Sequence, residues 1–155
     1  MTTNNNLFKQ CALIRFLYEE EKEISEPLPT IVIDGNRLEL PDGSEYLVLT
    51  DEEANDMADE AVKELLWAFN ANFILSTCGL NTNQTVAKSL QRMQEEACES
   101  CNDFILALIE GTCGLDEFTQ EAIYEDGRGH FLSTYDGEEH EINIGSETYY
   151  IYRTD

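Results

Sequence analysis

The chain carries two histidines, His130 and His140, and both lie in one short segment, EDGRGHFLSTYDGEEHE. Imidazoles among carboxylates and an arginine, Arg128, have the chemistry of a hydrolytic or metal site. Such a site needs further ligands from elsewhere, and no H-x-x-x-H or H-E-x-x-H spacing supports one. No Ser-His-Asp arrangement can be defended with these two bases. We therefore interpret the segment as turns and strand edges, and predict no catalytic residue.

A second set of reactive side chains is the C-x-x-C pair, Cys98 and Cys101. Two thiols at this spacing can bind zinc or exchange disulfides. Zinc would take two further ligands, which Cys78 and Cys113 could supply. However, the chain has no second C-x-x-C, and the pair falls inside a predicted helix with Cys101 on its apolar side. We expect buried or half-buried free thiols, with neither a metal nor a cofactor.

The charge is the outlying property of the composition. The chain has 32 Asp and Glu against 9 Lys and Arg, which gives a formal net charge of −23. Such a charge repels nucleic acid, acidic proteins and anionic membranes. Solubility alone requires a net charge of only about 2 to 8 in a small domain. Binding to a basic surface and adaptation to high salt are the two explanations of the excess.

The carboxylates are concentrated on one predicted helix. Thr50 and Glu53 form a capping box, and the helix from there to about Asn70 has an apolar stripe on one side. Opposite this stripe, six acidic residues recur at steps of three and four: Glu52, Glu53, Asp56, Asp59, Glu60 and Glu64. Each four-residue step advances about 6 Å along a helix, comparable to the spacing of phosphates on a nucleic-acid strand. We predict that these six residues bind a partner; the alternative is a solvated helix face.

The elements that must position these groups follow from periodicity and turn signals. Asp-Gly dipeptides at 34–35, 42–43 and 136–137 predict hairpins. An apolar seam close to a heptad repeat predicts one long helix. The predicted helices are 7–24, 51–70, 82–110 and 115–126. The predicted strands are two or three within 30–49, followed by 130–135, 139–144 and 147–153.

These elements indicate one α+β domain over residues 1–155. An antiparallel sheet built from 30–49 and 129–153 is expected to pack against the two main helices, 51–69 and 82–110. Trp67, with Phe69 and Phe73, is assigned to the core instead of a ligand-stacking patch. The apolar segments are too short and too charged for a membrane span. Neither a secretory signal nor a disulfide framework is evident, so we expect a reduced, cytoplasmic protein.

Two parts of the chain resemble a known group of proteins. The segments YLVLTDEEANDMADEAVKELLWAFN and DGRGHFLSTYDGEEHE, with the closing YYIYRTD, are similar to segments of small acidic proteins of bacteriophages and prophages. The likeness covers about half of the chain and brings no catalytic residue with it. It implies a phage-encoded protein that acts in the cytoplasm of an infected bacterium.

Charge and resemblance together predict a nucleic-acid mimic. The chain would occupy the basic surface of a host nucleic-acid-handling or defence protein, without binding nucleic acid itself. One alternative is a small metal-dependent or hydrolytic enzyme that uses His130 and His140. Another is an acidic structural or regulatory phage protein that forms homo-oligomers through its long helix.

Overall fold

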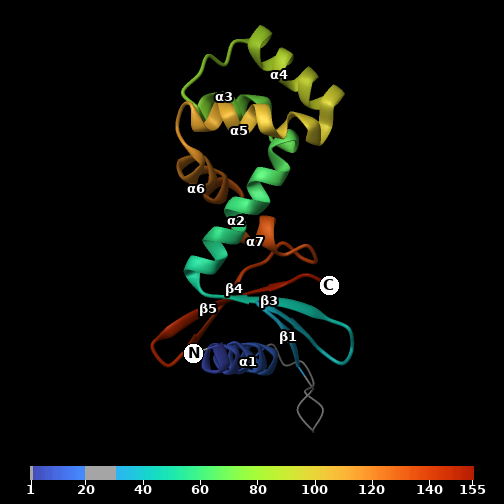
Figure 1. Cartoon of the computed structure of the whole chain (residues 1–155), viewed down its shortest axis with the longest axis vertical. Coiled ribbons are helices and arrows are strands. Elements are labelled where there is room, and N and C mark those ends of the chain that lie inside the picture. The colour runs from blue at the N-terminus through green and yellow to red at the C-terminus, as the bar shows by residue number, and fades with distance from the viewer. Residues whose placement is uncertain (1, 20–30) are drawn as a thin grey trace. The chain divides into compact units, whose positions relative to one another are not determined.

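The computed structural model describes residues 2–19 and 31–155 (Figure 1). The chain forms two compact units. We call Met1–Met57 with Gly127–Asp155 the sheet unit, and Ala58–Asp126 the helical unit. The predicted α+β class is confirmed. A single domain over residues 1–155 stays a prediction.

The sheet unit is built on a five-stranded sheet in the order β1-β2-β3-β5-β4, in which all neighbouring strands are antiparallel. The strands are β1 (Val32–Asp34), β2 (Arg37–Glu39), β3 (Glu45–Leu49), β4 (His140–Ile144) and β5 (Glu147–Arg153). Gly35 and Gly43 have positive φ at two of the three predicted hairpin turns, where a side chain would be strained. The third turn, at 136–137, does not join two strands, because Arg128–Leu132 before it form a helix. Val48 lies opposite Ile151, so β3 and β5 join distant parts of the chain.

One face of the sheet is covered by α1 (Thr2–Glu19). The helix starts earlier than predicted, and positions 20–24 of the prediction lie outside the described residues. The sequence analysis gave this covering position to 51–69 and 82–110, but 82–110 belongs to the helical unit. The core between α1 and the sheet consists of Ala12, Leu13, Phe16, Leu17, Leu38, Leu40, Tyr46, Val48, Ile142, Tyr149 and Ile151.

The strand predicted at 130–135 is wrong, because residues Arg128–Leu132 form a short helix, α7. Phe131 and Leu132 are both buried, which period-two alternation in a strand does not allow when one face is solvated. Gly129 makes the close packing of α7 possible. A Cβ built on it would lie 2.3 Å from the carbonyl oxygen of Gly137, so α7 packs directly on the backbone of the 136–139 turn.

Gly129→Ala should therefore lower the free energy of unfolding by about 1–3 kcal/mol, since the added methyl group must displace backbone atoms. Chemical denaturation followed by circular dichroism measures this. The exposed neighbour on the same helix gives the control: His130→Ala should change stability by less than about 0.5 kcal/mol. Equal stabilities of Gly129→Ala and the parent chain would contradict the close approach.

The helical unit contains the end of α2 (Asp51–Leu65) and six further helices or turns of helix. They are η1 (Leu66–Ala68), α3 (Ala71–Thr77), α4 (Gln84–Ala97), α5 (Asn102–Glu110) and α6 (Leu115–Asp126), with a 3₁₀ turn, η2 (Cys98–Cys101), between α4 and α5. The 115–126 helix is confirmed. Helix α3 was not predicted, and the preceding helix was expected to continue to Asn70. The side chain of Asn70 instead caps α3, where it accepts from the backbone N–H of Asn72 and Phe73.

The predicted continuous helix over 82–110 is wrong, since the chain turns at η2 (Figure 1). Cys98 has φ 48°, a left-handed conformation that disfavours a side chain. The break is held by two amides: Gln94 donates to the carbonyl of Phe69 at 2.8 Å, and Asn102 donates to that of Glu64 at 2.8 Å. The continuous seam expected to mediate pairing therefore does not form, and its members Val86 and Phe104 are exposed.

Cys98→Gly should raise the free energy of unfolding by about 0.5–1 kcal/mol, because glycine adopts this backbone conformation without strain. Cys98→Ala is the matched control and should have no such effect, because it keeps the Cβ. Thermal and chemical unfolding of the two variants measure the difference. If glycine destabilises the chain relative to alanine, the turn at Cys98 is not strained.

The aromatic residues of the helical unit divide into two groups. Phe69, Phe73 and Phe118 form a cluster with ring centroids 5.4–5.7 Å apart, in which Phe118 is buried and the two residues predicted for the core, Phe69 and Phe73, are half-buried. Trp67 is also half-buried and does not belong to this cluster. None of the helices in residues 2–19 and 31–155 has the length and apolarity needed to cross a membrane.

Candidate functional site

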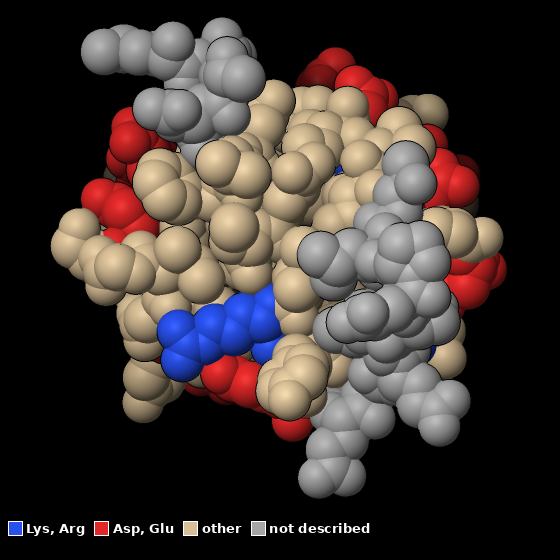
Figure 2. Space-filling model, turned by 90° about the horizontal axis from the view of Figure 1, so that it is seen from below, with Lys and Arg blue, Asp and Glu red and all other residues tan. Residues whose placement is uncertain are grey.

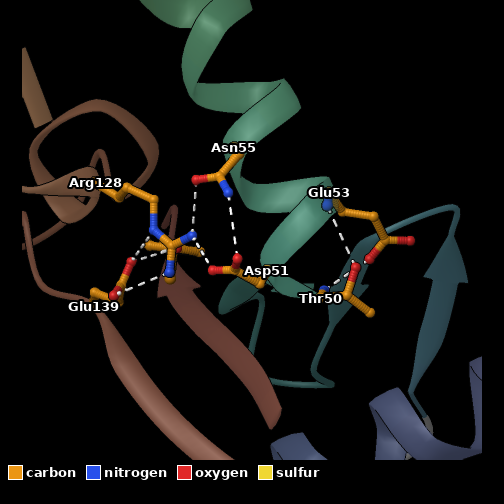
Figure 3. Close-up of polar contacts among 7 residues, drawn as sticks. Thr50, Asp51, Glu53, Asn55, Arg128 and Glu139 are labelled. Atoms are coloured by element: carbon orange, nitrogen blue, oxygen red, sulfur yellow. Dashed lines mark hydrogen bonds and ion pairs between the residues drawn. The ribbon is translucent and has the colours of Figure 1, made fainter. Parts of the chain in front are cut away.

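The acidic helix α2 begins with the predicted capping box (Figure 3). The Thr50 N–H donates to Glu53 Oε2 at 2.9 Å, and the Glu53 N–H donates to Thr50 Oγ1 at 3.3 Å. Glu53 Oε2 also accepts from Lys9 Nζ at 2.7 Å. The capping box is confirmed, and the carboxylate of Glu53 is committed to it and to an ion pair.

Lys9 is the basis of this arrangement, and sequence reasoning did not identify it. Its side chain is 1% exposed and also donates to Asn36 Oδ1 at 2.5 Å. It thereby connects α1, the first hairpin and the start of α2. Burial opposes ionisation of Glu53, but the hydrogen bonds from Lys9 and Thr50 outweigh it and hold the pKa of Glu53 below its ordinary value.

Arg128 fixes the same turn of α2 from the other side (Figure 3). Its guanidinium donates to both oxygens of Glu139, at 2.8 and 3.3 Å, to Asp51 at 2.8 Å and to Asn55 at 3.1 Å. It also lies 4.3 Å from the ring centroid of Tyr150. Burial works against its charge, but the bonds to Glu139 and Asp51 raise the pKa of Arg128. The side chain is 9% exposed and is a structural cation.

The Glu139 carboxylate has a further partner, the hydroxyl of Tyr152, which donates to it at 2.5 Å. Burial, followed by the bond to Glu139, raises the pKa of Tyr152 well above its usual range. The hydroxyl therefore stays protonated, and the segment from Arg128 to Glu139 is bound to β5. Ser133 adds a second tie, because its hydroxyl donates to Asp136 at 2.7 Å and lies 2.7 Å from the carbonyl oxygen of Arg153.

The two histidines do not form a site with these groups. His130 is exposed on α7. The His140 ring lies 4.6 Å from that of Phe16, against the core beneath α1. Within the described part of the chain, no group of three or more His, Cys, Asp and Glu side chains is placed to hold a metal ion.

The cysteines are free thiols, as expected. Cys101 is buried and donates to the carbonyl of Cys98 at 3.0 Å, but Cys98 itself is exposed, contrary to the prediction. Cys113 is half-buried and donates to the carbonyl of Gly114 at 3.5 Å. Burial raises the pKa of both Cys78 and Cys101. The two buried thiols are therefore poor nucleophiles at neutral pH.

The six predicted partner-binding carboxylates separate into two kinds. Glu53 is bound internally, and Asp59 is half-buried. The other four are exposed at successive four-residue steps of α2: Glu52, Asp56, Glu60 and Glu64. Glu60 pairs with Lys63. Among the described residues, Glu52, Asp56 and Glu64 form no ion pair with a lysine or arginine.

The surrounding charge is uneven. Leu7, Phe8 and Tyr18 are exposed on α1. The face of the sheet unit shown in Figure 2 is largely uncharged among its coloured residues, with Asp and Glu gathered around the edge. In the helical unit, α6 carries a second row of exposed carboxylates that the sequence analysis did not single out: Asp116, Glu117, Glu121 and Glu125.

The helical unit also contains a groove of about 760 Å³ that sequence reasoning missed. It lies among η1, α3 and α4, and Trp67 and Phe69 contribute aromatic surface. Five side-chain amides line it: Asn70, Asn72, Gln84, Gln91 and Gln94. Its charged lining residues are Lys88 and Glu95. The signal in the sequence was the absence of carboxylates from Leu65 to Gln94.

Fold and surface define an acidic α+β protein whose cations are used mainly to hold its own carboxylates. No family model, curated protein or solved structure matches the chain. Its function therefore has to be argued from its own residues.

Glu53→Gln should lower the free energy of unfolding at pH 7 by about 2 kcal/mol, because Lys9 stays buried without its counter-charge. The pKa of Glu53 is lowered by folding, so its ionised form stabilises the chain above its ordinary pKa near 4.5. This contribution disappears as the pH falls through the folded-state pKa.

The stability difference between the parent chain and Glu53→Gln should therefore shrink between pH 6 and pH 3. Urea denaturation at each pH measures it. Glu52→Gln, the exposed neighbour, should change stability at pH 7 by less than about 0.5 kcal/mol. A difference for Glu53→Gln that is constant over this pH range would contradict the ion pair.

Proposed function

We propose that the chain is a phage-encoded binding protein that inhibits a host nucleic-acid-handling or defence protein by occupying its basic surface. The observation that carries the proposal is the row of exposed carboxylates on α2, of which Glu52, Asp56 and Glu64 form no internal ion pair among the described residues. A solvated helix face usually alternates its charges. These carboxylates have the sign and approximate spacing of a phosphate backbone.

The first turn of α2 is suited to this role because its conformation is fixed before binding. Lys9 and Arg128 hold Glu53 and Asp51 from opposite sides of the turn. Glu52 and Asp56 project from the same turns with no such partners among the described residues. Preorganised charges lose little conformational entropy on binding, which favours affinity.

The mechanism is occupancy combined with electrostatic attraction. A net charge of −23 steers a basic partner towards the chain and accelerates association, while it repels the nucleic acid that competes for the same surface. No catalytic step is involved. The metal-dependent alternative would need His130 and His140 to join further ligands, and among the described residues no group of three or more His, Cys, Asp and Glu side chains is placed to hold a metal ion.

Neutralising the α2 row tests the proposal. The quadruple variant Glu52→Gln, Asp56→Asn, Glu60→Gln, Glu64→Gln leaves the capping box, Lys9 and Arg128 untouched. A partner captured from bacterial lysate on the tagged parent chain at low salt should bind this variant at least about tenfold more weakly, mainly through a slower association rate. Surface plasmon resonance measures both rates. Affinity of the parent chain should fall steeply with salt, since the Debye length is about 10 Å at 0.1 M.

The matched control removes the same number of charges from α6: Asp116→Asn, Glu117→Gln, Glu121→Gln, Glu125→Gln. It should retain most of the affinity. Duplex DNA or structured RNA, whichever the partner binds, should displace the parent chain. Equal losses of affinity in the two quadruple variants would show that binding depends only on net charge. A partner that binds the chain and nucleic acid simultaneously would exclude mimicry.

A further inference from the structure

The groove of the helical unit differs from the rest of the surface of this chain, because the segment that lines most of it contains no acidic residue. The chain has 32 carboxylates, yet the segment Leu65–Gln94, which supplies most of the groove, has none. Glu95 is the acidic residue of the lining, and it accepts a hydrogen bond from Gln91 at 2.9 Å. The groove is thus a neutral, hydrogen-bonding hollow in a strongly acidic protein.

Its floor is rigid. Gln94 is 6% exposed, and its side-chain N–H₂ donates to the carbonyls of Leu66 and Phe69 at 3.3 and 2.8 Å. Asn102 accepts from the backbone N–H of Trp67 at 2.8 Å, which fixes η1 from the opposite side. Because these bonds join η1 to α4 and α5, the shape of the groove exists before any ligand binds.

The lining offers both donors and acceptors. Each side-chain amide presents one carbonyl oxygen, which accepts hydrogen bonds, and one N–H₂ group, which donates them. These groups can pair with the N–H and C=O groups of a peptide backbone. Among the described residues, the side chains of Asn72 and Gln84, the ammonium of Lys88 and the indole N–H of Trp67 have no hydrogen-bond partner. A ligand with alternating N–H and C=O groups can satisfy such a surface.

The apolar part of the lining provides room for an anchor. Trp67 is half-buried, and small side chains at Ala68, Ala71 and Ala87 leave the space beside it. A volume of about 760 Å³ lies within the usual range of ligand sites, roughly 300–1,000 Å³. One large apolar side chain fits this description, flanked by backbone that reaches the amides.

The charge of the whole chain selects among ligands. Anions such as nucleotides and acidic peptides are repelled by a net charge of −23, and the single lysine of the lining, accompanied by a glutamate, gives them no compensating site. A neutral sugar can form hydrogen bonds with the amides but is not attracted by the negative charge of the chain. A peptide with lysine or arginine beside its anchor can form these hydrogen bonds and is also attracted by the charge.

We infer that this groove binds an extended peptide segment that carries one large apolar anchor with lysine or arginine beside it and lacks acidic residues. The site is separate from the carboxylate row of α2 and does not depend on it.

A random library of 12-residue peptides, displayed on messenger RNA and selected on the immobilised full chain at 0.15 M salt, tests the inference. Enriched peptides should contain a large apolar residue and be depleted of Asp and Glu. Trp67 is the single tryptophan of the chain and lines the groove, so binding of each synthetic peptide should shift its fluorescence.

Two matched variants locate the site. Asn72→Ala with Gln91→Ala removes two groove amides and should weaken binding about tenfold or more, equivalent to two hydrogen bonds. Ser76→Ala with Ser89→Ala changes exposed residues of the same two helices outside the groove and should stay within twofold. Both are checked for folding by circular dichroism.

Three results would overturn the inference: no enrichment over the library background, equal binding by the two double variants, or a tryptophan response to maltotriose in place of the peptides. The α2 quadruple variant separates the two proposals. It should bind the selected peptides as the parent chain does, whether or not it binds the host partner.

Discussion

Folding of this chain depends on where its few cations lie, and the buried ion pair between Lys9 and Glu53 is the contact on which the rest of the sheet unit relies. Thirty-two carboxylates repel one another, and the chain has only nine lysines and arginines to set against them. Lys9 does so from α1, with its ammonium buried between Asn36 of the first hairpin and the capping box of α2. Removing one partner of such a pair leaves a buried charge uncompensated, which is strongly destabilising.

Arg128 completes the same arrangement from the C-terminal part of the chain. It joins the start of α2 to the turn at Glu139, and Tyr152 fixes that turn on β5. The acidic side chains of α2 therefore have two different roles. Asp51 and Glu53 neutralise internal cations, while Glu52 and Asp56 remain exposed. The proposal of a basic partner rests on the second group, so a sequence count of acidic residues overstates the binding face.

Part of this architecture could be predicted because its determinants are local. The capping box at Thr50, the Asp-Gly turns at 34–35 and 42–43 and the strands of the last hairpin are each specified by a few neighbouring residues. The turn at Cys98 could not be predicted, since no glycine or proline marks it. It exists because Gln94 and Asn102 satisfy backbone carbonyls about 25 to 40 residues away in the chain. The α7 helix was hidden for a similar reason, because its close packing depends on contact between Gly129 and a turn formed later in the sequence.

The candidate site could likewise be predicted only in part. Periodicity identified the α2 row, but the burial of Lys9 that removes Glu53 from it depends on the tertiary fold. The groove was visible in the sequence only as a run without carboxylates, because its amides come from α3 and α4 and from the turns before them. Side-chain chemistry alone did not show that these residues share one hollow.

The central claim is that exposed carboxylates of α2 contact the partner directly. Carboxyl footprinting measures this: a carbodiimide couples glycine ethyl ester to accessible Asp and Glu side chains, and mass spectrometry quantifies labelling with and without the bound partner. We expect protection of Glu52, Asp56, Glu60 and Glu64, with unchanged labelling of Glu117, Glu121 and Glu125 on α6. Protection of the α6 residues with α2 labelled as in the free protein would contradict it.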